Sequence, residues 1–256
     1  MSAVPDLGSA HLVASLDDGV LNLRINRPER RNAFTQEMYR GIKRAAIWAD
    51  REPYVEVVCL TGTDNWFGSG GDLAMRGEED PTLAAEWDAL DHHPFRHIER
   101  CRKIWVARIN GLCHAGGLDL ALHCDVTVAA ATARFRIPEL LRGLADPYMP
   151  DRLVAAVGLA RARYLFFTAS EIDAPTAMAA GLLGDVVPAD QLDAKVAWII
   201  EQIKLTGPSA RTLIKREINR RLPVADPSLF AQIPIAEIHE GMASFVERRP
   251  PQWPRG

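Results

Sequence analysis

A glycine-containing loop that runs directly into an apolar helical pattern constrains the fold of this chain more than any other stretch. The loop carries Gly111, Gly116 and Gly117, and the helical pattern follows from Leu118. Glycines at such a junction let a substrate approach the backbone closely, and the first amides of a helix have no partner within it. These amides and the helix dipole stabilise negative charge. The stretch predicts an anion-stabilising backbone site, although the same pattern also occurs in turns and tight packing.

Two carboxylates flank this junction in the sequence. Asp119 falls in the first turn of the helical pattern, and Glu139 follows Pro138 beyond a β-branched strand pattern at Val126 to Val128. Backbone donors that stabilise an oxyanion, together with acid/base carboxylates, indicate chemistry on a carbonyl compound. The alternative for Asp119 is a purely structural acid, since the first turn of a helix favours negative charge.

Composition fits one enzyme domain without disulfides. The chain has 256 residues, of which 48% are hydrophobic and 25% charged, and its formal net charge is −3. This balance gives no electrostatic reason to expect a nucleic acid or membrane partner. The start shows no signal-peptide pattern, and no apolar run is long enough to span a bilayer. The cysteines show no CxxC spacing, so we expect buried free thiols and a cytoplasmic protein.

Periodicity predicts the secondary structure of both halves of the chain. Alternating residues around Asp18-Gly19 predict a hairpin of His11 to Ser15 with Val20 to Ile25, and Thr35 is the expected N-cap of a helix reaching about Asp50. Two buried strands are expected at Val57 to Thr61 and Ile104 to Ile109, and a polar helical segment at Pro81 to Arg102. Three C-terminal helices are expected at Leu192 to Ile203, Leu213 to Ile218 and Ser228 to Arg249, and the last has enough apolar positions to contact another subunit.

A second glycine loop upstream makes the first loop a more specific indication of function. Residues 67–73 read Phe-Gly-Ser-Gly-Gly-Asp-Leu and follow a strand that ends in Thr61-Gly62. A TG strand end, an F-x-x-G-x-D-L loop, an N-G-x-x-x-G-G-G-like loop and a P-E pair occur in this order. This order resembles the enoyl-CoA hydratase/isomerase (crotonase) superfamily. The resemblance runs from Asn26-Arg27-Pro28 to the Arg248-Arg249-Pro250 ending.

The resemblance implies an α/β fold, a crotonase-like spiral of ββα turns. Residues 1–200 would form the spiral core, and residues 201–256 a C-terminal helical region for oligomerisation. Members of the family assemble as homotrimers, which often pair as hexamers. Periodicity alone also permits a conventional α/β sheet.

The resemblance also implies an acyl-CoA thioester substrate, with no separate cofactor and no metal. The amides of Gly71 and Gly116 would hold the thioester oxygen, and the nucleotide end of coenzyme A would lie near Arg30 and Arg31. Each arginine, taken singly, also fits a solvated basic turn. The remaining residues expected to line the coenzyme A site are Ala33, Ser69, Asp72 and Leu73. His93 and His97 have the four-residue spacing of a metal pair, but a solvated or substrate-lining helix is the preferred interpretation.

The acids carry the reaction in this interpretation. Glu139 falls where the hydratases keep the glutamate that exchanges the Cα proton, and Asp119 where they keep a glutamate that holds the attacking water. Aspartate is one methylene shorter than the glutamate of the hydratases. Family isomerases that act on conjugated dienes carry aspartate at the position of Asp119, together with a third acid further along the chain. Asp146, in a Gly-Leu-Ala-Asp segment that is one residue short, resembles that third acid. The family usually has glycines after the P-E pair, and this chain has prolines there instead. The sequence therefore does not fix the shape of the acyl pocket.

We therefore expect a hydratase that adds water to a 2-enoyl-CoA. The first alternative is a dienoyl-CoA or enoyl-CoA double-bond isomerase. The second is a non-catalytic acyl-CoA-binding or partner-binding member, since some relatives bind RNA. The net negative charge argues against RNA binding, and the presence of Glu139 together with Gly71 and Gly116 argues against a catalytically inactive protein.

Overall fold

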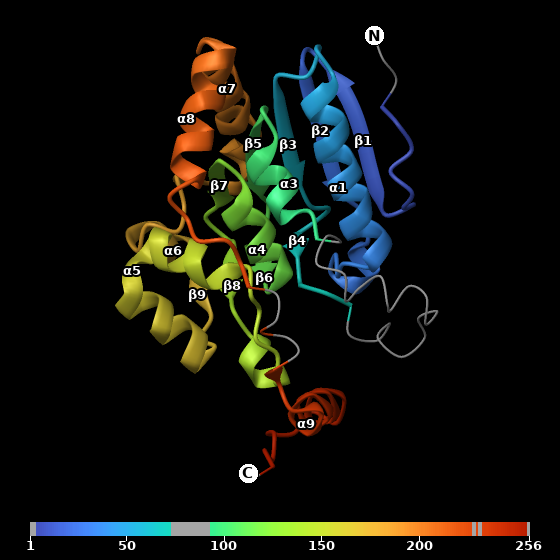
Figure 1. The fold of residues 1–256 in the computed structure, drawn as a ribbon, viewed down its shortest axis with the longest axis vertical. Helices are drawn as coiled ribbons and strands as arrows, with labels where there is room; N and C mark the ends of the chain where they lie inside the picture. The colour runs from blue at the N-terminus through green and yellow to red at the C-terminus, as the bar shows by residue number, and fades with distance from the viewer. Residues whose placement is uncertain (1–3, 73–92, 227–228, 230–231, 255–256) are drawn as a thin grey trace.

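Two sheets, stacked along a spiral, form the core of the computed structural model, which describes residues 4–72, 93–226, 229 and 232–254. The larger sheet has the strand order β1-β2-β3-β5-β7-β10, and the smaller has the order β4-β6-β8-β9. Figure 1 shows the short strands grouped below the longer sheet. The bounds are β1 Leu12–Asp17, β2 Val20–Ile25, β3 Val57–Thr61, β4 Trp66–Gly68, β5 Ile104–Ile109, β6 Leu112–His114, β7 Val126–Ala130, β8 Arg134–Arg136, β9 Ile172–Asp173 and β10 Asp185–Val187.

Each turn of the spiral contains one long strand and one short strand. β3 continues into β4, β5 into β6 and β7 into β8, so that the chain contributes to both sheets in every turn. The long strands pair in parallel from β2 through β10, and only the β1–β2 and β8–β9 pairs are antiparallel. The predicted ββα spiral is confirmed, and so is the hairpin, which turns between Asp17 and Val20.

Helices cover both faces of the larger sheet, which explains why its strands are apolar without alternation. Val58, Leu60 and Trp105 belong to the main core with α1, whereas Val57 and Val106 pack with α7 in a second cluster. The helices are α1 Gln36–Arg51, α3 Phe95–Arg100, α4 Gly116–His123, α5 Met149–Thr168, α6 Ala174–Ala179, α7 Leu192–Lys204, α8 Pro208–Asn219 and α9 Ile235–Val246, with short 3-10 helices η1 Pro28–Arg30, η3 Glu139–Arg142 and η4 Ala189–Gln191.

Helix α1 begins where the sequence predicts. The Thr35 hydroxyl accepts a hydrogen bond from the Met38 amide at 3.3 Å, which satisfies one of the free amides of the first turn. The face carrying Met38, Ile42 and Ala49 is fully buried. This helix therefore anchors the N-terminal segment on the sheet.

The C-terminal region differs from the prediction in one respect. A helix from Ser228 is wrong, because α9 begins at Ile235 after Pro234, and residues 232–234 are not α-helical. Proline has no amide proton and disfavours the interior of a helix, so Pro234 sets the boundary. Helix α9 packs on η3 of the same chain, where Gly241 lies against the backbone of Arg142.

Two further expectations meet the structure only in part. The helical segment predicted from Pro81 to Arg102 lies largely outside the described residues, which include only α3 from it. All four cysteines are free, and Cys59, Cys101 and Cys113 are buried, but Cys124 is only half-buried. Within the described residues, no helix combines the length and apolar character needed to cross a membrane.

Candidate active site

The two glycine loops predicted from the sequence are in direct backbone contact. A Cβ atom added to Gly117, in the first turn of α4, would lie 2.4 Å from the carbonyl oxygen of Gly68 at the end of β4. A Cβ added to Gly70 would lie 2.4 Å from the Cβ of Ala115 and 3.4 Å from the amide nitrogen of Gly116. Real side chains cannot approach so closely, so only glycine lets these loops meet.

The amides of Gly71 and Gly116 are available to a ligand. Gly71 sits in a bridge to Phe34 in which the neighbouring Gly70 carbonyl and Asp72 amide make the hydrogen bonds, both at 2.8 Å. Gly116 is the first residue of α4, so its amide has no intrahelical acceptor. Among the described residues, neither amide donates a hydrogen bond. A Cβ added to Gly71 would meet no atom within 4 Å, so this position faces open space.

Three carboxylates come together next to these loops. Asp119 lies in the first turn of α4 and is completely buried, Glu139 begins η3, and Asp146 precedes α5. Within the described part of the chain, both carboxylate oxygens of Asp119 and Oε2 of Glu139 are buried without a hydrogen bond. Unpaired buried acceptors are costly in a structural role, and they are expected where a ligand will bind.

The electrostatics of these acids depend on burial and on one another. Burial raises the pKa of Glu139 to about 8; the charge of Asp119 adds to this, whereas Glu139's own backbone and Arg142 act against it. Burial likewise raises the pKa of Asp146 well above its ordinary value, and the charges of Asp119 and Glu139 contribute. Glu139 is therefore mostly protonated at neutral pH and able to donate a proton.

Asp146 lies near enough to the other two acids for their charges to act on it, despite the residue missing before it. The backbone amide of Tyr148 donates to Asp146 Oδ1 at 2.7 Å, which fixes the carboxylate at the start of α5. Its role in the reaction stays a prediction.

The predicted coenzyme A residues lie on two segments, one around Arg30 and one around Asp72, which an ion pair joins. Arg30 and Arg31 are exposed, and the Arg31 guanidinium lies 5.4 Å from the centre of the Trp66 ring. Ala33 and Ser69 are half-buried, and Leu73 lies outside the described residues. Asp72 has a structural contact, because its Oδ2 lies 2.7 Å from a guanidinium nitrogen of the buried Arg27. This ion pair ties the second glycine loop to the segment that carries the exposed arginines.

Sequence reasoning missed a group of aromatic rings beside the site. His93 stacks on Phe95 with ring centroids 5.4 Å apart, and Tyr39 and Tyr148 both contact these two rings. The Tyr39 hydroxyl lies 2.2 Å from where a Gly116 Cβ would be. No local pattern could have found this group, since its members come from three separate segments. His93 thus takes part in ring packing, and no group of three metal ligands exists among the described residues.

Sequence reasoning also missed His123, four residues after Asp119. Its Nδ1 lies 3.3 Å from Asp119 Oδ1, and helical neighbours at this spacing share a face. That spacing was the signal which could have identified it.

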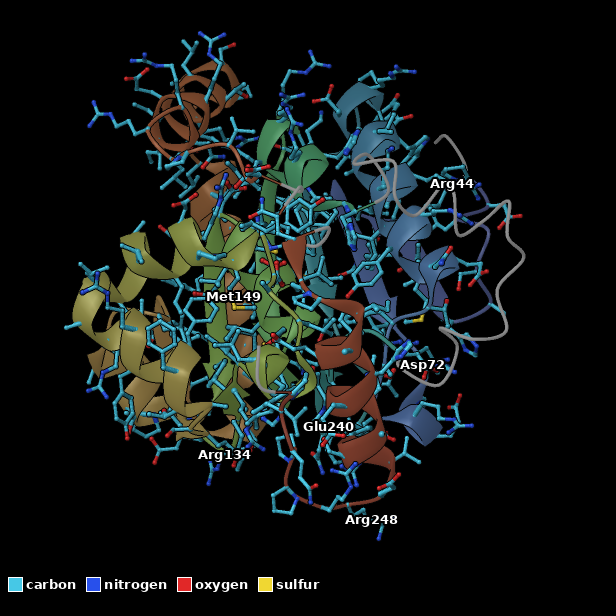
Figure 2. All side chains as sticks on the ribbon, turned by 60° about the horizontal axis from the view of Figure 1, so that its bottom comes forward. Arg44, Asp72, Arg134, Met149, Glu240 and Arg248 are labelled. Carbon is cyan, nitrogen blue, oxygen red and sulfur yellow. The ribbon has the colours of Figure 1, made fainter. Side chains whose placement is uncertain are left out.

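In Figure 2, helix α9, which carries Glu240, crosses the face of the molecule between the labels of Asp72 and Met149.

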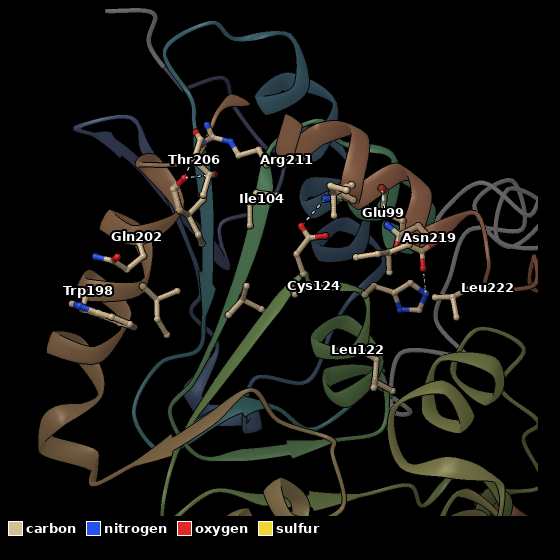
Figure 3. A pocket seen from close by; sticks show the side chains of 18 residues that line it. Glu99, Ile104, Leu122, Cys124, Trp198, Gln202, Thr206, Arg211, Asn219 and Leu222 are labelled. Atoms are coloured by element: carbon tan, nitrogen blue, oxygen red, sulfur yellow. Dashed lines mark hydrogen bonds and ion pairs between the residues drawn. The ribbon is translucent and has the colours of Figure 1, made fainter. Parts of the chain in front are cut away.

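One well-formed cavity has none of the three acids in its lining. It has a volume of about 600 Å³ and is bounded by α7, α8 and the edge of the larger sheet (Figure 3). Its lining includes Trp198, Ile203 and Ile214, and also Glu99 and His123, but none of the predicted catalytic residues. The candidate site is therefore defined by its acids and backbone donors rather than by this cavity.

Comparison with known proteins agrees with this geometry. A family model described as enoyl-CoA hydratase/isomerase matches residues 15–256. A crotonyl-CoA hydratase of Syntrophomonas wolfei is 30% identical over 249 residues, which are 93% of this chain and 96% of that protein. A 2,3-dehydroadipyl-CoA hydratase of Escherichia coli is 29% identical and matches over 95% of this chain and 98% of its own length.

Solved structures give the same result. A crystal structure of an enoyl-CoA hydratase from Mycobacterium avium subsp. paratuberculosis superposes with a TM-score of 0.81 at 27% identity, covering 96% of this chain and 99% of that one. An enoyl-CoA hydratase/isomerase from Pseudoalteromonas atlantica gives 0.81 at 30% identity, covering 95% and 100%. From its sequence, its fold and the glycine loops that meet beside its buried acids, this chain belongs to the enoyl-CoA hydratase/isomerase family.

Proposed function

We propose that this protein adds water across the double bond of a 2-enoyl-CoA thioester. The observation that carries the proposal is the pair of acids Asp119 and Glu139, with buried carboxylate oxygens that accept no hydrogen bond, beside two loops that present free glycine amides. The names of the family relatives, which are crotonyl-CoA and other enoyl-CoA hydratases, support the same reaction.

In the proposed reaction, the thioester oxygen accepts hydrogen bonds from the amides of Gly71 and Gly116. These bonds strengthen as negative charge grows on the oxygen, and the loss of one such donor costs about 3–4 kcal/mol of transition-state stabilisation. Asp119 takes a proton from water while the water oxygen bonds to Cβ. The π electrons of the double bond move into an enolate, and Glu139 then gives its proton to Cα.

The pH dependence follows from the proton that Glu139 must donate. Because burial raises the pKa of Glu139 to about 8, the group is protonated at neutral pH and loses its proton above that value. We expect kcat for hydration to fall as the pH rises through about 8. A kcat that stays constant from pH 7 to 10 would contradict the assignment of Glu139 as the donor.

Substitution of the acids tests the proposal directly. Glu139→Gln and Asp119→Asn should each abolish hydration of crotonyl-CoA, followed by loss of the conjugated enoyl absorbance, whereas Asp146→Asn should have little effect. Glu37→Gln, at an exposed position of α1, is the matched control and should keep full activity. Full activity in both acid variants would refute the enzymatic proposal.

A second candidate is a double-bond isomerase acting on the same class of thioester, and Asp146 is the observation that favours it. Isomerisation of a diene needs one group to remove a proton and another to return a proton at a distant carbon. A third carboxylate coupled to Asp119 and Glu139 supplies such a group. A dienoyl-CoA substrate should then be converted by the wild type and not by Asp146→Asn.

Binding of coenzyme A is proposed at the exposed arginines. Arg30 and Arg31 follow one another on the segment that Arg27 ties to the second glycine loop, so a phosphate could be held by either or both. Calorimetry with acetyl-CoA should show weaker binding for the double variant Arg30→Ala/Arg31→Ala. Arg51→Ala, at the exposed end of α1, is the control, and equal affinity in both variants would move the phosphate site elsewhere.

Assembly as a trimer or hexamer in the cytoplasm completes the proposal. An apolar strip on α8, formed by Leu213, Ile214 and Ile218, is more than half exposed in the single chain. Strips of this kind are usually covered by another protein surface. The free buried thiols fit a reducing compartment.

A further inference from the structure

His123 connects an acid of the candidate site to an acid on another helix. The imidazole is buried, and its Nδ1 lies 2.8 Å from the main-chain oxygen of Asp119 and 3.3 Å from Asp119 Oδ1. Its Nε2 lies 3.6 Å from Oε1 of Glu99 on α3. Each ring nitrogen therefore has a carboxylate beside it, and the dashed contact at Glu99 is visible in Figure 3.

The connection continues to a third helix. Arg152 on α5 holds Glu99 with two hydrogen bonds, from Nε at 2.8 Å and from Nη2 at 3.0 Å. Its Nη1 donates to the carbonyl oxygen of Pro223 at 2.6 Å. The side chains of Asp119, His123, Glu99 and Arg152 are each 11% exposed or less, so solvent screens their interactions only weakly.

Negative and positive side chains alternate along this buried row, which consists of Asp119, His123, Glu99 and Arg152. Burial by itself lowers the pKa of His123, but the charge of Asp119, with its hydrogen bonds, and the charge of Glu99 reverse the effect, so the pKa lies above its ordinary value. The groups that face the ring are Asp119 from its own helix, Glu99 from α3 with Arg152 behind it, and Phe95, whose ring centroid is 4.8 Å away. An imidazolium places a positive charge between the two carboxylates, while its Nδ1 donates to the main-chain oxygen of Asp119.

The row distinguishes Asp119 from the other acids of the cluster. Asp119 has a cationic partner in direct contact, whereas burial and like charge dominate at Glu139 and Asp146. The three acids therefore have different electrostatic environments.

We propose that His123 is a positioning residue: as an imidazolium between Asp119 and Glu99, it holds the Asp119 carboxylate in place by opposite charge, so that Asp119 acts as the base and Glu139 as the acid. This assignment rests on the proposed hydration, although the ion pair itself does not. A histidine that served only to fill the core would not need an acid at each nitrogen.

The ion pair can be tested without any activity assay. Titration of the His123 ring followed by NMR should show a proton retained to higher pH than the ordinary imidazole value allows. In Asp119→Asn, and separately in Glu99→Gln, the ring should lose its proton at lower pH than in the wild type. A His123 ring that titrates in the ordinary range, or that is unaffected by both substitutions, would overturn the proposal.

Kinetics test the role in the reaction. His123→Gln keeps a hydrogen-bonding side chain but removes the charge, so kcat for crotonyl-CoA should fall about tenfold or more with KM nearly unchanged. The acidic limb of its pH profile should also move to higher pH. His11→Gln is the control and should match the wild type. Wild-type kcat and an unshifted limb in folded His123→Gln would refute the positioning role.

Glu99→Gln provides a second route if His123→Gln does not fold. It acts on the far side of the ring, and it should move the acidic limb in the same direction with a smaller loss of kcat. An unchanged pH profile in Glu99→Gln would then overturn the proposal. If the wild type itself does not hydrate crotonyl-CoA, the proposed function fails, while the NMR titration still decides on the ion pair.

Discussion

Replacement of Glu139 by glutamine should stabilise the protein at alkaline pH while it removes activity. The folded chain keeps the Glu139 proton up to about pH 8, whereas the unfolded chain releases it near the ordinary value of 4.5. Between these two values the folded state binds more protons than the unfolded state. Stability due to this group is therefore present below pH 4.5 and is lost as the pH rises toward 8. Glutamine cannot ionise, so the variant escapes this loss.

The magnitude follows from the difference between the two pKa values. One pKa unit corresponds to roughly 1.4 kcal/mol, so the ionisation of Glu139 destabilises the wild type by about 4 kcal/mol at pH 8. Most of this cost develops between pH 5 and pH 8. Over that interval, the free energy of unfolding of Glu139→Gln should rise relative to wild type by about 3 kcal/mol.

Urea denaturation at pH 5 and pH 8, at one protein concentration, measures this difference. The comparison between pH values cancels the direct packing effect of the substitution, and Glu37→Gln, an exposed substitution, should show no change relative to wild type. Hydration should be absent in Glu139→Gln at both pH values. If the stability of Glu139→Gln relative to wild type is the same at pH 5 and pH 8, Glu139 ionises like a solvated glutamate, and the reasoning is refuted.

Three further predictions concern the scaffold. Ala115 has φ 51° and ψ −131°, a conformation that favours glycine, so Ala115→Gly should raise the melting temperature through relief of about 1 kcal/mol of strain; a lower melting temperature would contradict this. Lys215 is buried and its Nζ donates to Asp125 Oδ2 at 2.7 Å. Lys215→Met should therefore lower the free energy of unfolding, measured by urea denaturation, by about 3–5 kcal/mol, and the double variant Lys215→Met/Asp125→Asn should regain part of this loss. Wild-type stability of Lys215→Met would argue against the buried pair. Light scattering at micromolar concentration should report a trimer or hexamer, and a monomer would exclude the proposed assembly.

Local pattern was sufficient for the elements whose cause is local. The hairpin follows from alternation around Asp18-Gly19, and α1 follows from the Thr35 cap and a helical apolar stripe; both are present as predicted. The continuous apolar run of β3 indicates cover on both faces, which α1 and α7 provide. The start of α9 was missed because apolar spacing was given more weight than Pro234.

The site could be predicted only as far as single segments define it. The glycine loops, Asp119 and Glu139 are marked by their own motifs, but whether Asp146 faces them depends on how η3 and α5 are oriented. The structure brings Asp146 near Asp119 and Glu139 through the packing of two elements that no motif describes. The contact of His123 with Glu99 likewise depends on how α3 packs against α4, which sequence spacing does not contain.

The packing of α9 on η3 also orders events during synthesis. Gly143, at the end of η3, lies against the backbone of Glu237, and Gly241 lies against Arg142, so neither element reaches its final environment without the other. A ribosome that has made η3 has not yet made α9. The backbone that carries Glu139 therefore stays unsupported on the nascent chain, and a translation product that stops before α9 would lack a finished acid group. The acid group is then completed only after α9 has been made.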